Sequence, residues 1–341
     1  MKGTGSGLGI HGAKGLGAGR ASHGGRGTSA LAKASRVRDS VQISGRKEVA
    51  SGLADISTMI FDMDGVIWRG SRLIDGAREA IESLEAQGRR VFYLTNNSAK
   101  SRAQCAEKLA SFGIKASTDQ VVCSSSSAAR YLDSISFDKS KKVLVIGQAG
   151  ILIELALSGY QTVTCEDLSP SSEAKCSIEE YEGMAVDEKI GAVVAGVDDS
   201  FTYRKLCIAS LYLSTGSRDD PRVFVATNLD VGDRVGFDGR LIPGAGPVVA
   251  SLERACGREA VNVGKGGSWL LPNLVEVFDL DQKGTCIVGD RVDTDIALGK
   301  EAGMVTILPL TGVTNEDDLL RCRNDMYPDL IVHSIAALQS D

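Results

Sequence analysis

Short apolar, strand-like runs alternate with amphipathic helical segments along the chain from residue 57 onward. Apolar residues at helical spacing occupy 77–86 and 101–112, and a glycine follows each segment. This alternation is typical of βαβ units, so we expect a doubly wound parallel α/β sheet with helices on both faces. The expected strands are 58–61, 90–94, 120–123, 285–288, 305–308 and 330–332.

A second alternation lies between the third and fourth of these strands, which indicates an inserted α/β domain. We expect its strands at 143–146, 161–164, 192–197 and 223–226, with helices ending at 158 and spanning 203–214. The predicted division is an extension at 1–55, a core domain at 56–138 and 237–341, and an inserted domain at 139–236.

The N-terminal segment, residues 1–38, differs in composition from the rest of the chain. It carries seven Lys and Arg residues and no Asp or Glu, which leaves −13 for the remainder of a chain whose net charge is −6. Glycine is frequent in the segment and no hydrophobic period is sustained, so we expect residues 1–55 to be disordered. Arg-rich, acid-poor composition is typical of organelle transit peptides. We therefore expect a plastid stromal protein, with a mitochondrial location or a cytoplasmic protein with a basic arm as alternatives.

Histidine and cysteine usage excludes several kinds of site. Residues 24–332 contain no histidine, which excludes a Ser-His-Asp triad and a multi-histidine metal site. No two of the eight cysteines have zinc-ligand spacing, and no apolar run is long enough to span a membrane. The chemistry must therefore depend on carboxylates, Lys, Thr or Ser, and any metal must be a hard ion bound by oxygen.

Polar residues follow several of the expected strands directly. In a parallel sheet, ligands bind beyond the carboxyl ends of the strands. Taken singly, each of these residues has an ordinary structural interpretation as a turn, a helix cap or a surface lysine. Their joint occurrence favours one site. The residues are Asp62-Met63-Asp64-Gly65, Thr95-Asn96-Asn97, Lys265 between glycines, and Asp290.

This set of side chains suits phosphoryl transfer with Mg²⁺ as cofactor. Magnesium prefers octahedral oxygen ligation, which Asp62, Asp290 and the backbone carbonyl of Asp64 can supply together with water and a phosphate. A carboxylate that attacks phosphorus needs positive charge beside it, from the ion and from Lys265. Thr95 can donate a hydrogen bond to a phosphoryl oxygen.

Together these motifs resemble those of the haloacid-dehalogenase-like phosphohydrolases. The resemblance extends over about residues 56–338 and is closest to the branch of 4-nitrophenyl phosphatases, phosphoglycolate phosphatases and pyridoxal phosphate phosphatases. It implies a Rossmann-like core with an inserted α/β cap domain. The segments that carry it are 94–98, 196–206, 226–230, 243–246 and 289–291.

The resemblance also implies a role for each matching residue. Asp62 would be the nucleophile that becomes an aspartyl-phosphate, and Asp64 the acid that protonates the leaving group and then activates water. Asp290 would be a further magnesium ligand. Thr95 and Lys265 would bind the phosphoryl oxygens. Asn96 and Asn97 would lie close to the substrate, and Asp295 would orient Lys265 or a metal-bound water.

One departure from the family pattern concerns the loop that holds Lys265. The family usually has proline after this lysine, whereas this chain has Gly266 and Gly267. Because glycine lacks the φ restraint of proline, we expect a more mobile loop and at most weaker phosphate binding.

The inserted domain is expected to cover the site and to choose the substrate. The resemblance implies a small phosphorylated metabolite and a homodimer through the cap. Arg234 could pair with a substrate carboxylate, which favours 2-phosphoglycolate, although an Arg–Asp surface pair is an equal alternative. Pyridoxal phosphate and glycerol phosphate remain alternative substrates. Two other classes stay open: a phosphorylated signalling receiver, and a nucleic-acid binder, against which the −13 charge of the body argues.

Overall fold

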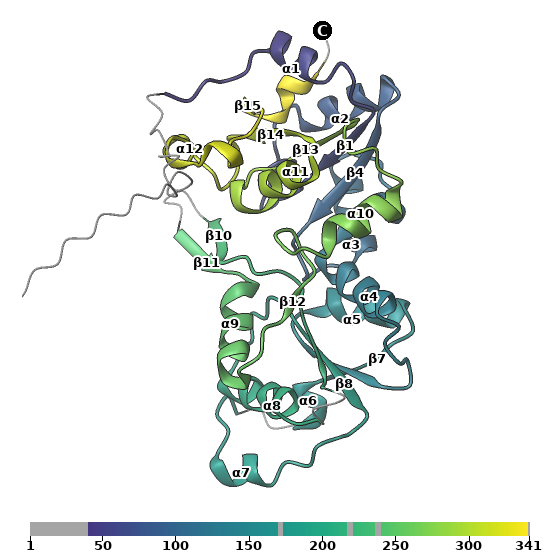
Figure 1. Cartoon of the computed structure of the whole chain (residues 1–341), viewed down its shortest axis with the longest axis vertical. Helices are drawn as coiled ribbons and strands as arrows, with labels where there is room; N and C mark the ends of the chain where they lie inside the picture. The colour runs from purple at the N-terminus through teal and green to yellow at the C-terminus, as the bar shows by residue number, and fades with distance from the viewer. Residues whose placement is uncertain (1–39, 170–172, 217–220, 236–239, 340–341) are drawn as a thin grey trace, which may run out of the picture. The chain divides into compact units, whose positions relative to one another are not determined.

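The first of two parallel sheets in the described part of the chain has six strands (Figure 1). The computed structural model describes residues 40–169, 173–216, 221–235 and 240–339, with only the backbone for 233–235. The sheet confirms the predicted parallel α/β fold. Its order is β15 (Leu330–Val332), β14 (Val305–Pro309), β13 (Thr285–Val288), β1 (Thr58–Phe61), β4 (Arg90–Thr95) and β5 (Val121–Cys123).

Helices cover both faces of this sheet because its central strand is apolar on both sides. All four residues of β1 are buried, and alternate side chains enter different clusters. Met59 and Phe61 pack with the apolar face of α2, whereas Ile60 packs with α10. The helices of this part are α2 (Ala77–Ala86), α3 (Arg102–Ser111), α10 (Leu270–Phe278), α11 (Ala297–Ala302) and α12 (Glu316–Arg321).

The folded part begins earlier than the sequence predicted. Residues 40–55 were expected to be disordered, but the structure has α1 (Arg46–Gly52), and the backbone N–H of Ser44 donates to the carbonyl of Ile331. Val49 and Leu53 are buried in the core cluster with β1. Their spacing of four residues places both on one helix face, which gives this segment enough apolar surface to pack. The prediction for residues 1–39 lies outside the described residues.

A second, five-stranded parallel sheet corresponds to the inserted domain. Its order is β12 (Val261–Asn262), β9 (Val223–Ala226), β8 (Ile190–Ala195), β6 (Lys142–Ile146) and β7 (Gln161–Thr164). Its helices are α4 (Ser124–Ser134), α5 (Ala149–Leu157), α6 (Cys165–Leu168), α7 (Ile178–Glu182), α8 (Tyr203–Ser214) and α9 (Ala245–Cys256).

The limits of this second sheet differ from the expected 139–236. Helix α4 packs on β6 through Ala128 and Leu132, and α9 packs on the other face through Val249 and Leu252. Strand β12 pairs with β9, so that Val261 lies opposite Val225. The segment that builds the second sheet and its helices therefore extends from α4 to β12. A two-residue strand gives almost no sequence signal, which explains the difference.

Two short antiparallel hairpins lie outside the two parallel sheets. One consists of β2 (Trp68–Arg69) and β3 (Arg72–Leu73), and the other of β10 (Gly232–Val235) and β11 (Arg240–Pro243). Neither was expected from the sequence, because strands of two to four residues show no clear alternation. Both follow polar residues at the carboxyl ends of parallel strands.

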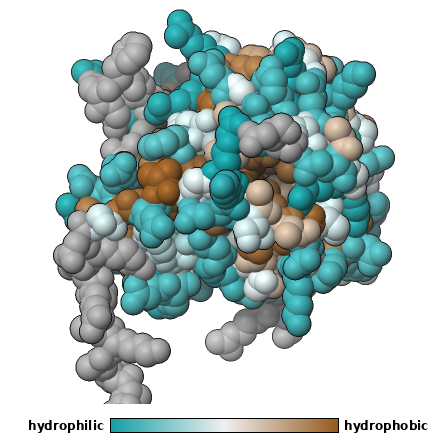
Figure 2. Space-filling model, turned by 90° about the horizontal axis from the view of Figure 1, so that it is seen from above, coloured by the Kyte–Doolittle hydropathy of each residue, from teal (hydrophilic) through white to brown (hydrophobic). Residues whose placement is uncertain are grey.

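The face seen in Figure 2 is mostly hydrophilic, with small apolar areas separated by polar side chains. None of the described helices has both the length and the apolar character that crossing a lipid bilayer requires.

Candidate active site

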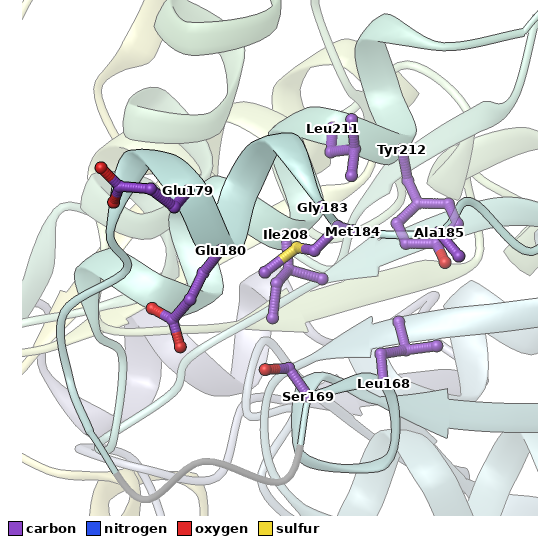
Figure 3. A pocket seen from close by; sticks show the side chains of 10 residues that line it. All are labelled: Leu168, Ser169, Glu179, Glu180, Gly183, Met184, Ala185, Ile208, Leu211 and Tyr212. Atoms are coloured by element: carbon purple, nitrogen blue, oxygen red, sulfur yellow. The ribbon is translucent and has the colours of Figure 1, made fainter.

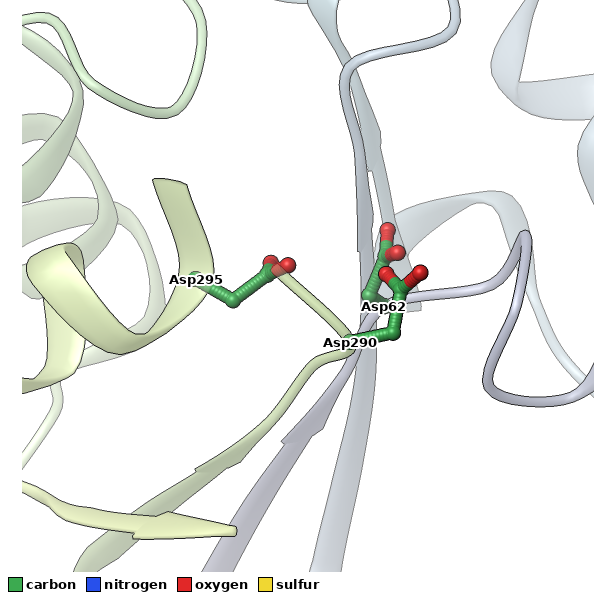
Figure 4. Close-up of side chains that lie close together, drawn as sticks. All are labelled: Asp62, Asp290 and Asp295. Carbon is green, nitrogen blue, oxygen red and sulfur yellow. The ribbon is translucent and has the colours of Figure 1, made fainter. Parts of the chain in front are cut away.

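Three buried carboxylates meet at the carboxyl edge of the first sheet. Asp62 follows β1 and Asp290 follows β13, and these strands are direct neighbours with Phe61 opposite Val288. Asp295 reaches the same point from a helical turn, as Figure 4 shows. One oxygen from each carboxylate lies within 4.8 Å of the others. The predicted convergence of strand ends therefore brings Asp62 and Asp290 together, and the helical turn adds Asp295.

The position of Asp295 depends on an irregular helical turn. Residues Val292–Ile296 form a π-helical turn in which the N–H of Ile296 donates to the carbonyl of Arg291, five residues earlier. Single π turns are frequent at functional sites because the extra residue re-aims the side chains within the turn. Here the turn directs the Asp295 carboxylate toward the site (Figure 4).

Lys265 is the cation at the centre of this cluster. Its Nζ lies 2.6 Å from Oδ1 of Asp62 and 2.7 Å from Oδ1 of Asp295. The side chain is 3% exposed. Although burial alone would lower the pKa of Lys265, the Asp295 and Asp62 carboxylates raise it above its ordinary value. Lys265 is therefore protonated at neutral pH and provides fixed positive charge beside Asp62.

Burial dominates the electrostatics of the two strand-end carboxylates. It raises the pKa of Asp62 well above the ordinary value, against the charge of Lys265 and with further increases from Asp295 and Asp290. It also raises the pKa of Asp290 to about 6, to which the Asp295 carboxylate contributes. The site holds more negative charge than Lys265 neutralises, so an added cation would be stabilising.

The surroundings of Asp290 show that space is reserved for its carboxylate. A Cβ atom on Gly312 would lie 1.8 Å from Oδ2 of Asp290, and one on Gly65 would lie 2.5 Å from it. The same oxygen accepts a hydrogen bond of 2.6 Å from the N–H of Val313. Three oxygen donors in a buried, net acidic cluster fit a hard divalent cation such as Mg²⁺. The predicted backbone ligand, the carbonyl of Asp64, stays a prediction.

Asp290→Asn is predicted to make the metal-free protein more stable and to reduce the stabilisation that Mg²⁺ gives. The unfolded Asp290 ionises near 3.8 and the folded one near 6, so its ionisation destabilises the protein as the pH rises through this window. The cost is complete above pH 6, where about two pKa units correspond to about 3 kcal/mol. In thermal unfolding at pH 7.5 without metal, the variant should be more stable than the unmodified protein. Addition of Mg²⁺ should then raise the unfolding temperature of the unmodified protein by more than that of the variant. Equal metal responses would contradict the assignment of Asp290 as a ligand.

Thr95 ends β4 with its hydroxyl available as a donor. The Thr95 side chain is buried, and its Oγ1 accepts a hydrogen bond of 3.1 Å from the N–H of Asn97. Because that partner uses the oxygen, the hydroxyl proton is left for a phosphoryl oxygen. Oδ1 of Asn97 accepts from the N–H of Ala99, which fixes the turn after the strand.

Asn96 lines the cavity with the other candidate residues and also makes hydrogen bonds within the protein. Its Oδ1 accepts the N–H of Lys265 at 2.7 Å, and its Nδ2 donates to both oxygens of Asp230 at 3.0 and 3.1 Å. Both polar ends of this side chain are thus used within the protein. These bonds give Asn96 a positioning role toward Lys265 and Asp230, and its predicted contact with the substrate stays a prediction. Its backbone carbonyl accepts a further bond from Asn228.

Asp230 is a site residue that sequence reasoning missed. Burial raises its pKa, while Arg291 and Lys265 lower it. It lies in the 226–230 segment that carries part of the family resemblance, and this segment was the one sign in the sequence that Asp230 could belong to the site.

The loop around Lys265 is held by its contacts, although it lacks the family proline. Gly266 has φ of +89°, which proline cannot adopt and which favours glycine. Cβ atoms on Gly264 and Gly267 would lie 2.4 Å and 2.0 Å from backbone carbonyl oxygens. The glycines therefore allow a close approach of the loop to its neighbours. The N–H of Lys265 also donates to Oδ1 of Asn96, and the expected greater mobility of the loop stays a prediction.

Asp64 lies beside the cluster rather than within it. Its Oδ1 accepts a hydrogen bond of 2.6 Å from Nε1 of Trp68 and lies 3.8 Å from Nζ of Lys108. The Asp64 side chain is 51% exposed. The predicted acid is therefore accessible to a substrate, two residues from Asp62.

A cavity of about 920 Å³ contains all of the described candidate side chains except Asp295. Residues of both sheets line it, including Phe201, Asp198 and Val248 from the inserted part. Arg69, Lys265 and Arg291 are its described cationic side chains. The side chain of Arg234, predicted to bind substrate, lies outside the described residues.

Another cavity, of about 410 Å³, lies among α6, α7 and α8 (Figure 3). Its acidic lining residues are Glu179 and Glu180, and none of the predicted site residues lines it. A phosphate ester would be repelled by these carboxylates. The larger cavity is therefore the candidate substrate site.

Comparison with known proteins agrees with this geometry. The family models for haloacid dehalogenase-like hydrolase and HAD-hydrolase-like proteins match residues 59–161 and 262–338. The chain belongs to the haloacid dehalogenase-like hydrolases. It is 38% identical to phosphoglycolate phosphatase 1A, chloroplastic, of Arabidopsis thaliana, over 89% of this chain and 82% of that protein.

Solved structures of the family have the same fold. The 4-nitrophenylphosphatase of Thermotoga maritima is 27% identical with a TM-score of 0.68, covering 84% of this chain and 97% of that one. A glycerol phosphate phosphatase of Mycobacterium tuberculosis in complex with magnesium is 26% identical with a TM-score of 0.68, covering 85% and 79%. This chain is a phosphoric monoester hydrolase of the same family.

Proposed function

We propose that this phosphatase hydrolyses 2-phosphoglycolate and that it depends on Mg²⁺. The buried carboxylates Asp62 and Asp290 would hold the ion, with Asp295 beside them. Bound Mg²⁺ supplies positive charge that screens the phosphate from the attacking carboxylate. The magnesium complex of the Mycobacterium tuberculosis relative supports this choice of metal.

The residues of the chain support a two-step mechanism. In the first step, the Asp62 carboxylate attacks phosphorus, the ester P–O bond breaks, and Asp64 gives its proton to the leaving oxygen. In the second step, Asp64 takes a proton from water, the water oxygen bonds to phosphorus, and the Asp62–phosphorus bond breaks. Lys265 and Thr95 donate hydrogen bonds to the phosphoryl oxygens as their charge develops.

The substrate proposal rests on which cationic side chains of the cavity already have an acidic partner in the protein. Lys265 is paired with Asp62 and Asp295, and Arg291 is bound to Asp293. The Arg69 side chain, in contrast, is exposed and makes no ion pair or hydrogen bond with the described residues. Trp68 beside it in β2 is buried, and adjacent strand residues point to opposite sides. Arg69 is therefore available for a second anionic group, such as a carboxylate, on a phosphate ester.

Arg69→Met is predicted to raise KM for 2-phosphoglycolate by about tenfold, equivalent to about 1.4 kcal/mol, because a charge-assisted contact is lost. KM for glycerol 3-phosphate, which lacks the carboxylate, should change by less than about twofold on the same scale. Steady-state kinetics on both esters measures this difference. Arg72→Met, a change of the register partner across the hairpin, is the matched control. If Arg69→Met leaves the ratio of the two KM values unchanged, Arg69 does not recognise the carboxylate. Arg234 would then be the next residue to change.

Glycerol phosphate is the second candidate substrate, supported by the name of the Mycobacterium tuberculosis relative. If glycerol phosphate is the substrate, kcat/KM of the unmodified enzyme should be higher for glycerol 3-phosphate than for 2-phosphoglycolate. A direct comparison that also includes pyridoxal phosphate decides among the three.

We also propose that the basic N-terminal segment directs the protein to plastids. Its charge of +7 without acidic residues supports this, as does the chloroplastic name of the Arabidopsis relative. A fluorescent protein carrying residues 1–55 should accumulate in the stroma, and cytoplasmic or mitochondrial fluorescence would contradict the proposal. A homodimer through the cap remains a prediction, which analytical ultracentrifugation tests directly.

A further inference from the structure

Two side chains outside the phosphate-binding cluster converge on one oxygen of Asp64. Nε1 of Trp68 donates to Oδ1 at 2.6 Å, and Nζ of Lys108 lies 3.8 Å from the same Oδ1. Among the described residues, no hydrogen bond or ion pair reaches Oδ2. The two oxygens of this carboxylate are therefore in different environments, because the protein holds only Oδ1, and Asp64 is one of the residues that line the cavity.

Trp68 is a fixed donor rather than a mobile surface residue. Its side chain is 2% exposed, and its ring lies 5.7 Å from that of Phe112 at the end of α3. The Trp68 carbonyl accepts the N–H of Gly65, which closes the turn between Asp64 and β2. A buried indole needs a hydrogen-bond partner for its N–H, and here that partner is Asp64.

Lys108 reaches the same place from a different element. It lies in the last turn of α3, and its Nζ is 4.1 Å from the centre of the Trp68 ring. A cation over the face of an indole is held by the ring quadrupole. Trp68 thus binds both the carboxylate, through its edge, and the lysine, through its face. The three side chains form one connected set.

We propose that Trp68 and Lys108 are positioning residues that hold Oδ1 of Asp64 and so leave Oδ2 as the oxygen that exchanges the proton with the leaving group and the water. The inference rests on the proposed role of Asp64. Trp68 and Lys108 touch neither the phosphate cluster nor the reacting atoms, and they act through the orientation of the acid. A misplaced acid costs rate only where the leaving group needs a proton.

The leaving group therefore separates positioning from a structural role. The alkoxide of 2-phosphoglycolate or glycerol 3-phosphate is strongly basic and needs protonation as the P–O bond breaks. The 4-nitrophenolate anion is stable and leaves without it. Loss of a positioned acid should lower kcat/KM for the two alkyl esters alike and leave kcat/KM for 4-nitrophenyl phosphate almost unchanged. This pattern also differs from that of Arg69, which would separate the two alkyl esters.

The test compares Trp68→Phe and Lys108→Met on these three esters with Mg²⁺ present. Trp68→Phe keeps an aromatic ring against Phe112 and removes the N–H. We expect kcat/KM for both alkyl esters to fall by about 10²-fold for Trp68→Phe, which is the low end of general acid catalysis, and by a smaller factor of about ten for Lys108→Met. The value for 4-nitrophenyl phosphate should stay within about threefold, and Lys108→Arg should recover most of the loss because it keeps the cation.

Matched controls and a reference variant make the outcomes distinct. Trp269→Phe changes the second tryptophan of the chain, and Lys115→Met changes an exposed lysine just beyond α3. An equal loss on all three esters, or no loss on any, would overturn the positioning role, and Lys108→Met tests it even if Trp68→Phe fails to fold. Asp64→Asn is the reference. If Asp64→Asn keeps its activity on the alkyl esters, the proposed role of Asp64 is wrong. If Asp64→Asn loses that activity while Trp68→Phe and Lys108→Met keep it, only the positioning role is wrong.

Discussion

Asp62→Asn is expected to reduce kcat on every phosphate ester by about 10⁴-fold or more, because the variant has no carboxylate to form the covalent intermediate. Asn has nearly the shape of Asp, and Lys265 keeps its second partner, Asp295, at 2.7 Å. The fold should therefore survive. Thermal unfolding and circular dichroism check that, and phosphate release with Mg²⁺ measures the loss.

The control for this variant is Asp55→Asn, which removes an exposed carboxylate away from the site and should keep full activity. If Asp62→Asn retained more than about one hundredth of the original kcat, nucleophilic attack by Asp62 would be wrong. Phosphoryl transfer would then have to proceed by direct attack of water.

Lys265→Met should lower both activity and stability by large amounts. The change removes the cation that lies between the Asp62 and Asp295 carboxylates and leaves both buried. Removing one partner of a buried ion pair costs about 3–5 kcal/mol of unfolding free energy. We expect a clearly lower urea midpoint in the absence of metal, with partial recovery on adding Mg²⁺, which would supply replacement charge.

Lys283→Met is the matched control for that experiment, because Lys283 lies in an exposed turn and its loss should change stability by less than about 0.5 kcal/mol. An unchanged midpoint for Lys265→Met would mean that the carboxylates are protonated in the folded protein. The ion-pair description of the site would then be incorrect.

Much of the first sheet and of its site was predictable because the signals are local. Strands β1 and β13 each end in three apolar residues, and an aspartate follows within two positions, so their ends could be placed without knowledge of the fold. In a parallel sheet such ends meet at one edge, which brings Asp62 and Asp290 together. The same argument placed Thr95 at the end of β4.

The rest depends on contacts between residues far apart in the chain. The amide of Asn96 connects Asp230 and Lys265, which follow it by 134 and 169 positions. No local pattern reports such a bond. The joining of β12 to the second sheet is equally non-local, because it depends on a two-residue edge strand.

The most direct test of the central claim is to identify the residue that carries the phosphoryl group. Asp64→Asn should accept labelled phosphate from 4-nitrophenyl phosphate, whose leaving group needs no proton, but should hydrolyse the intermediate slowly because the base is missing. Rapid acid quenching and peptide mapping then locate the label. The mechanism predicts an acyl phosphate on the peptide that contains Asp62. Label on a Ser or Thr peptide, or no label despite turnover, would contradict it.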